Sequence, residues 1–155
     1  ECGFLLILLA LTGTFALFQN FTSYRPGQSL KGKSLSIYLT DEIDAENGTR
    51  LRAFPDPITL RKDQHLLVVC IFNESSKDAS NVRLHDFIQE NQPVPPPFVA
   101  GDPGVKSIKS GQRKCLRSGE EAIPTALGQF KYSISVDWED GTSETLDPKL
   151  IVDPF

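Results

Sequence analysis

Histidine and cysteine carry much of the metal binding and nucleophilic catalysis in proteins, and this chain has few of either. Its 155 residues include two histidines, three cysteines and no methionine. His65 falls in a polar turn and His85 in a segment of alternating polar and apolar residues, so we interpret both as surface or structural residues. A catalytic cysteine needs a base and a group that orients the base. We therefore expect no enzyme activity, no metal site and no cofactor.

Cys70 and Cys115 fall in two predicted strands that could face each other across a β-sandwich. An extracytoplasmic compartment would allow a disulfide bond between them. Two free buried thiols that pack as small hydrophobic side chains are the alternative interpretation. The sequence leaves both open, because disulfide formation depends on the distance between the two strands.

Acidic residues outnumber basic ones, with 20 Asp and Glu against 16 Lys and Arg. This balance lacks the basic surface of a nucleic-acid-binding protein, so we expect no nucleic acid among the partners. Asp41, Glu42, Asp44 and Glu46 cluster in one predicted turn, but their spacing does not match an EF-hand calcium loop. We interpret this cluster as a solvated acidic loop.

The chain begins with an uncharged run of 23 residues from Cys2 to Tyr24. A helix of that length spans roughly 35 Å, enough to cross a hydrocarbon core of about 30 Å. We expect this segment to meet the lipid bilayer through residues 2–24, with the β-domain on the extracytoplasmic, periplasmic side of the membrane. The predicted organisation is a transmembrane signal-anchor helix over residues 1–24, a linker over 25–33 and a β-sandwich over 34–155.

The rest of the sequence predicts an all-β domain. Short runs rich in β-branched and aromatic residues alternate with clusters of Gly, Pro, Asp and Asn, and no helical periodicity persists. This spacing favours an antiparallel β-sandwich or barrel, and we predict the sandwich. The predicted strands are Ser34–Leu39, Ile58–Arg61, Leu66–Phe72, Asn81–Ile88, Val105–Ile108, Arg113–Arg117, Phe130–Trp138 and Thr142–Val152.

Three segments of this domain favour contacts with other proteins. Leu66–Phe72 is apolar throughout, which is typical of a central strand covered on both faces, or of a strand that meets a partner with one face. Residues 91–104 hold five Pro and two Gly, which predicts a stiff, extended loop without ladder pairing, either a crossover or a docking arm. Phe130–Trp138 and the following Gly141 predict a terminal hairpin. The expected partner contacts are Pro95, Phe98 and Trp138.

The order of features in residues 55–153 resembles a cupredoxin-like domain. The segments that carry the resemblance are Pro57–Asp63, Asn81–Leu84, Ser107–Gln112, the G-x-[YF]-x-[YF] strand Gly128–Ile134, and Leu146–Pro148 with Ile151 and Val152. The blue-copper site of that family needs two His, one Cys and usually a Met. Ser80 stands where the first copper histidine would precede Asn81, and none of the other ligands follows Trp138. The resemblance therefore implies a copper-free member of the family.

These features together predict a non-catalytic accessory subunit that stabilises a larger membrane protein complex. Fold analogy suggests a photosynthetic reaction centre with its antenna, or a respiratory complex, as the host. Two alternatives stay open. A periplasmic ligand- or metal-binding module would need a pocket with converging polar groups. An enzyme would need a constellation that the pattern does not predict, around His85, Asp86 and Cys115.

Overall fold

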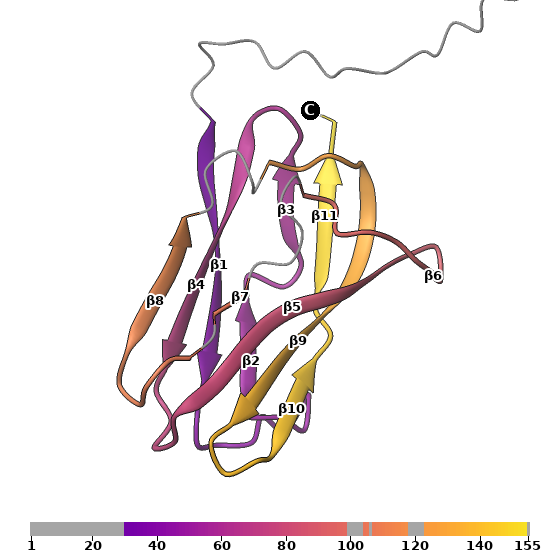
Figure 1. Ribbon diagram of the computed structural model, residues 1–155. Helices are drawn as coiled ribbons and strands as arrows, with labels where there is room; N and C mark the ends of the chain where they lie inside the picture. The colour runs from indigo at the N-terminus through magenta and orange to yellow at the C-terminus, as the bar shows by residue number, and fades with distance from the viewer. Residues whose placement is uncertain (1–29, 99–103, 106, 118–122, 155) are drawn as a thin grey trace, which may run out of the picture.

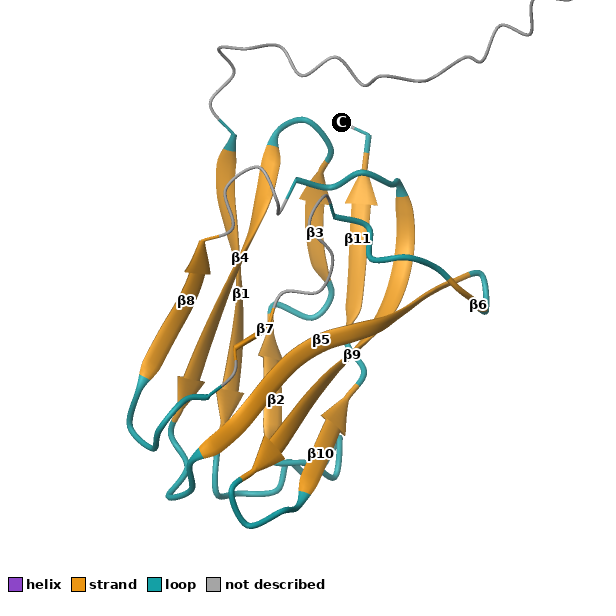
Figure 2. Cartoon of the chain, in the orientation of Figure 1, coloured by secondary structure: helices purple, strands orange, loops and turns teal. Residues whose placement is uncertain are grey.

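The computed structural model describes residues 30–98, 104–105, 107–117 and 123–154, and every regular element in these ranges is a β-strand (Figure 1 and Figure 2). The prediction of an all-β domain is confirmed. The strands are β1 (Lys31–Leu39), β2 (Leu51–Phe54), β3 (Ile58–Arg61), β4 (His65–Asn73), β5 (Ala79–Gln89), β6 (Gln92–Pro93), β7 (Gly104–Val105), β8 (Arg113–Arg117), β9 (Gly128–Trp138), β10 (Ser143–Leu146) and β11 (Lys149–Asp153).

The strands form two sheets that enclose one hydrophobic core (Figure 1). Sheet A has the strand order β2-β1-β4-β8, and sheet B has the order β3-β11-β9-β5-β6, with β10 paired to β9 and β7 paired to β5. Alternate residues of each strand face inward, as is usual for a sandwich. In sheet A these include Leu35, Ile37 and Leu39 of β1, and in sheet B they include Phe130, Tyr132, Ile134, Val136 and Trp138 of β9.

The expected antiparallel pairing holds for most neighbouring strands, but each sheet also contains one parallel pair. β1 runs parallel to β4 over nine residues, and β3 runs parallel to β11. The chain leaves β1 for the antiparallel strand β2, enters sheet B as β3 and returns to sheet A as β4. This excursion through the second sheet lets β4 enter sheet A in the direction of β1, which a simple hairpin cannot do.

The β-domain starts earlier than predicted, because β1 begins at Lys31 and takes in residues assigned to the linker. The Lys31 backbone N–H donates a hydrogen bond to the Gln64 carbonyl at 2.9 Å. A Cβ atom on Gly32 would come within 3.1 Å of Val68 Cγ2, so the glycine lets a neighbouring side chain lie across the strand. Glycine and lysine are poor strand signals, and pairing with β4 overrides them.

The predicted C-terminal hairpin is confirmed, with one interruption in its return strand. The Trp138 N–H donates to the Thr142 carbonyl at 2.8 Å, and Gly141 takes a φ of 83° in the turn. The segment predicted as one strand divides into β10 and β11 at Asp147-Pro148, because proline has no backbone N–H to donate. Both parts pair with β9.

Strands β2 and β6 were not predicted, and β6 contradicts the expectation that residues 91–104 form no ladder. Gln92–Pro93 pairs with the end of β5, after a turn in which Glu90 and Asn91 both have positive φ. The pairing is tolerated because β6 lies at the edge of sheet B, where the missing N–H of Pro93 breaks no central ladder.

The predicted signal-anchor helix over residues 1–24 and the first part of the linker lie outside the described residues. In the ranges that the structure does describe, no helix is long and apolar enough to cross a membrane.

Two buried polar atoms of β9 have no hydrogen-bond partner among the described residues, the Tyr132 hydroxyl and the Trp138 indole nitrogen. The Tyr132 ring stacks on Phe87 with the ring centroids 5.6 Å apart. Burial raises the pKa of Tyr132 far above its ordinary value of 10.0, and the charge of Asp56 adds to the shift. The core therefore holds this hydroxyl in its neutral form.

Replacing Tyr132 with Phe is expected to raise the free energy of unfolding by about 1 kcal/mol, because an unpartnered hydroxyl loses water without gaining a bond. The folded-state pKa lies above the unfolded one, so the wild-type protein loses stability as the pH rises above about 10, and Tyr132→Phe loses less. Urea unfolding at about pH 7 and about pH 11 measures both effects. A less stable variant near neutral pH would show that the hydroxyl has a partner.

Candidate functional site

Strand β4 presents apolar side chains on both faces of sheet A. Leu67, Val69 and Ile71 point into the core and are buried. Leu66, Val68 and Phe72 alternate with them, so they lie on the opposite face and are only partly buried. We call this side of sheet A, which faces away from sheet B, the outer face. Cys70 lies on the same face and is buried, so both interpretations of the apolar run stay open.

A row of aromatic and cationic side chains crosses the outer face. The register sets Arg52, Tyr38, Phe72 and Arg113 opposite one another on β2, β1, β4 and β8. The Tyr38 and Phe72 rings stack, with centroids 4.9 Å apart and an interplanar angle of 15°. The Arg113 guanidinium carbon lies 4.8 Å from the centre of the Phe72 ring, a cation–π contact. We call these four residues the aromatic row.

The next row along the same face contains the disulfide. Cys70 and Cys115 lie directly opposite each other on β4 and β8, and their sulfur atoms are bonded. This resolves the choice between a disulfide and two free thiols. The expected position across the sandwich is wrong, because the Cα atoms are 4.0 Å apart within one sheet. β4 and β8 are neighbours in sheet A, and directly opposed residues of an antiparallel pair are close enough to be bonded.

A hollow of about 550 Å³ opens beside the aromatic row, where β2 and the β1–β2 loop border the outer face. Tyr38, Phe54 and Leu146 supply its apolar lining. Phe54 is 70% exposed, more than any other large apolar side chain in the described ranges. Leu146 belongs to β10, so the hollow lies where an edge of sheet A approaches an edge of sheet B.

The charged lining of this hollow is mainly acidic. It consists of the carboxylates of Asp44, Glu46, Asp56 and Glu74 and the guanidinium of Arg52. Arg52 Nε lies 3.1 Å from Asp44 Oδ2, so the one cation is paired. Asp56 accepts a hydrogen bond from the Lys149 N–H at 2.9 Å. Glu46 and Glu74 form no ion pair within the part of the chain that is described.

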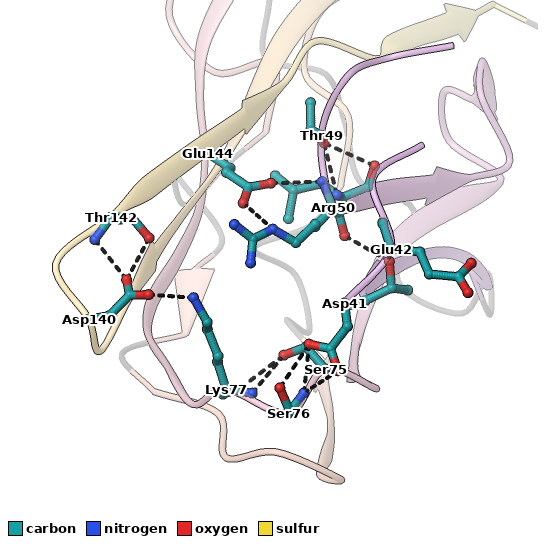
Figure 3. A network of polar contacts seen from close by, with 12 residues as sticks. Asp41, Glu42, Thr49, Arg50, Ser75, Ser76, Lys77, Asp140, Thr142 and Glu144 are labelled. Carbon is teal, nitrogen blue, oxygen red and sulfur yellow. Dashed lines mark hydrogen bonds and ion pairs between the residues drawn. The ribbon is translucent and has the colours of Figure 1, made fainter. Parts of the chain in front are cut away.

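Polar contacts brace the loops at this end of the sandwich (Figure 3). Asp41 Oδ1 accepts the Ser76 N–H at 2.9 Å, which ties the β1–β2 loop to the β4–β5 loop. Lys77 pairs with Asp140 in the β9–β10 turn. That contact, followed by hydrogen bonds from Thr142, holds the pKa of Asp140 well below its usual range. Three loops that are distant in sequence are therefore linked by side chains.

An ion pair also joins the two sheets beside the hollow (Figure 3). Arg50 Nε lies 2.8 Å from Glu144 Oε1, and the Arg50 backbone N–H donates to Glu144 Oε2 at 2.7 Å. The guanidinium carbon of Arg50 lies 5.7 Å from the centre of the Trp138 ring. Sheet A at the start of β2 is thus fixed to β10 of sheet B.

The two histidines have structural partners. His65 Nδ1 accepts the Arg61 N–H at 2.9 Å, and burial followed by nearby cations lowers the pKa of His65. His85 Nε2 lies 3.0 Å from Ser135 Oγ, and its Nδ1 lies 2.9 Å from Asp86 Oδ2. Within the described ranges no three His, Cys, Asp or Glu side chains are placed to hold a metal ion.

The structure does not bring together the residues of the enzyme alternative. His85 and Asp86 belong to β5 in sheet B, whereas Cys115 is bonded to Cys70 in sheet A.

Two of the three expected partner contacts are core residues. Phe98 is 6% exposed and meets the Phe87 ring edge-on, with centroids 6.1 Å apart. Trp138 is 2% exposed. Their expected contact with partners is wrong, because both side chains fill the space between the sheets of their own domain. Pro95 is exposed, and its role as a contact stays a prediction.

Sequence analysis missed Tyr38, Arg52 and Phe54 as members of a surface site. The signal for Arg52 and Phe54 was the alternation in Leu51–Phe54, which is short enough to be mistaken for a loop. Tyr38 was placed in a predicted strand, but its position beside Phe72 follows only from the parallel register of β1 and β4.

Comparisons with known proteins add little to this description. No family model and no curated protein matches the chain. Its structure is similar to the crystal structure of Na-dithionite reduced auracyanin from the photosynthetic bacterium Roseiflexus castenholzii, with a TM-score of 0.45 and 14% sequence identity. The match covers 81% of this chain and 100% of that one.

Replacing both Cys70 and Cys115 with Ala is expected to lower the free energy of unfolding by about 4 kcal/mol, because the bond closes a loop with a sequence separation of 45. Denaturant unfolding of the oxidised wild type and the double variant measures the loss. The wild type with dithiothreitol is the control, and it is expected to match the variant. Equal stability of all three samples would show that the bond contributes nothing.

The burial of Phe98 predicts a stability effect that its exposed neighbour lacks. Phe98→Ala is expected to lower the free energy of unfolding by about 3 kcal/mol, because it leaves a cavity against Phe87. Pro95→Ala is the matched control and is expected to change it by less than about 1 kcal/mol. Thermal unfolding of both variants measures the two effects. Equally small losses of stability would contradict the burial of Phe98.

Proposed function

We propose that this chain is a non-catalytic accessory subunit, anchored through residues 1–24, that helps to hold a larger membrane protein complex together. The sandwich lies on the extracytoplasmic, periplasmic side, and the host is a photosynthetic reaction centre with its antenna or a respiratory complex. The uncharged run from Cys2 to Tyr24 supports the anchor. The domain is a copper-free relative of the cupredoxins in this proposal, because the segments quoted from residues 55–153 follow that family's order while the copper ligands are missing.

The observation that carries the proposal is the outer face of sheet A. Leu66, Val68 and Phe72 lie there partly buried by their neighbours, and Phe54 is mostly exposed at its border. Apolar surface gathered on one face of a domain is typical of contact with another protein. Catalysis would instead need converging polar groups, and the described nucleophiles and bases lie apart or are paired.

The bonds around this face suit a docking surface. The Cys70–Cys115 bond fixes the edge strand β8, and the Arg50–Glu144 pair fixes β2 to the other sheet. A surface that is rigid before binding loses less conformational entropy when the partner arrives.

A second candidate function is the binding of a small molecule at another hollow, which is formed by β5, β9 and β11 of sheet B. A hollow of about 530 Å³ there is lined by Ile88, Phe130 and Ile151, with Lys131, Lys149 and Glu90 among its polar groups. Its size falls within the range of small-molecule pockets, which is about 300–1,000 Å³. Screening of the full chain against small organic anions and cations tests this alternative.

Extraction of native membranes with a mild detergent, followed by size separation, tests the accessory role. We expect the full chain to migrate with a pigment- or haem-bearing assembly, and a chain that lacks residues 1–24 to be lost from it. Phe54→Ser keeps residues 1–24 but removes apolar surface from the border of the outer face. We expect this variant to co-migrate with the assembly less than the unchanged chain does.

Leu127→Ser is the matched control, because Leu127 is also an exposed large apolar side chain but lies before β9, away from sheet A. Migration of the full chain as a lone 17 kDa species would contradict the accessory role and favour the small-molecule alternative.

A further inference from the structure

We infer that the hollow beside the aromatic row binds an extramembrane segment of a partner protein in which apolar and cationic side chains alternate. This inference rests on the proposed accessory function and names the chemistry of the partner at the docking surface. The apolar part of the segment would pack on Phe54 and Tyr38, and its lysine or arginine side chains would meet Glu46 and Glu74.

Charge complementarity selects a cationic partner. The hollow is lined by four carboxylates against one guanidinium, and that guanidinium is paired with Asp44. Asp56 is occupied by the Lys149 N–H, whereas Glu46 and Glu74 have no described cation beside them. An acidic partner would be repelled at close range, and a cationic one would be attracted.

The exposed ring explains why the partner must also carry apolar side chains. Phe54 is 70% exposed at the rim, and Ile43 on the neighbouring loop is 65% exposed. Burying large apolar side chains contributes affinity, while the surrounding carboxylates contribute orientation and selectivity. A lysine or arginine side chain of the partner could also lie over the Phe54 ring, where it would make a cation–π contact.

The position and charge of the hollow favour a protein partner over a lipid surface. The described chain enters sheet A at Lys31, at one end of β1 (Figure 1). The hollow is lined by Tyr38 and Thr40, at the other end of this strand. Eight residue steps of a strand cover roughly 26 Å. Negative lipid headgroups would also repel this acidic hollow, which favours a protein partner over a lipid surface.

The hollow is held in shape by the contacts that brace its loop. Asp44 accepts the Glu46 N–H on Oδ1 at 2.9 Å, and its carbonyl accepts the Gly48 N–H at 2.8 Å. The Glu74 N–H donates to the Leu39 carbonyl at 2.8 Å. These bonds fix the backbone beside both unpaired glutamates, so binding need not order the loop first.

Binding of two short synthetic peptides to the full chain in detergent micelles tests the inference. The peptides are identical except that leucine alternates with lysine in one and with glutamate in the other. We expect the lysine peptide to bind and its affinity to fall as salt is added. Glu46→Gln together with Glu74→Gln is expected to weaken binding about tenfold, since each exposed pair contributes modestly.

Glu139→Gln is the control, because Glu139 is an exposed carboxylate at the same end of the sandwich that does not line the hollow. Phe54→Ser is expected to abolish binding of the lysine peptide while thermal unfolding stays unchanged. The inference is overturned if neither peptide binds, if both bind equally, or if Glu139→Gln has the effect of the double variant. Self-association of the chain that Phe54→Ser removes would assign the surface to a second copy and also overturn it.

The same variants separate this inference from the accessory role. If the double glutamate variant still co-migrates fully with a membrane assembly, the accessory role stands and the inference fails. If the peptides behave as expected but no assembly co-migrates with the wild type, the binding chemistry stands and the accessory role fails.

Discussion

The parallel pairing of β1 with β4 determines where every feature of sheet A lies. It joins nine residues of each strand and makes both strands central, with β2 and β8 at the edges. The register places Tyr38 against Phe72 and so creates the stacked pair at the centre of the aromatic row. A shift of one residue would turn Leu35, Ile37 and Leu39 out of the core, so the buried face fixes the position of the exposed one.

This arrangement places partly exposed apolar side chains beside two edge strands, and exposed edge strands can lead to aggregation. Here each edge of sheet A is constrained by a different bond. The disulfide holds β8 to β4, and Arg113 on β8 places a charge over the Phe72 ring. At the other edge, Arg50 connects β2 to Glu144 of sheet B. The outer face therefore combines partly exposed apolar side chains with edge strands that are fixed in place by these bonds.

Alternation of residue types was enough to predict most strands, because burial of one face requires it. β3 and β8 have the predicted limits, and β9 differs only at its start. Pairing between distant segments was not accessible in the same way. β1 pairs in parallel with β4, and β3 with β11, because of the order in which the chain visits the two sheets. The residue pattern within a single strand does not predict that order. Burial of Phe98 and Trp138 was misjudged for the same reason, since a proline-rich loop and a hairpin end look exposed until the opposite sheet is placed.

Carboxylates at the loop end of the sandwich serve two different purposes, and their partners distinguish them. Asp140 accepts bonds from Lys77 and Thr142 that depress its pKa, and Ser143 followed by Asn81 depresses the pKa of Asp137. A depressed folded-state pKa contributes stability above the unfolded value of 3.8, and the contribution is lost as the pH falls through the folded value. These bracing contacts therefore persist throughout the neutral range. Glu46 and Glu74 have no such partners among the described residues, so their charge is available to whatever occupies the hollow.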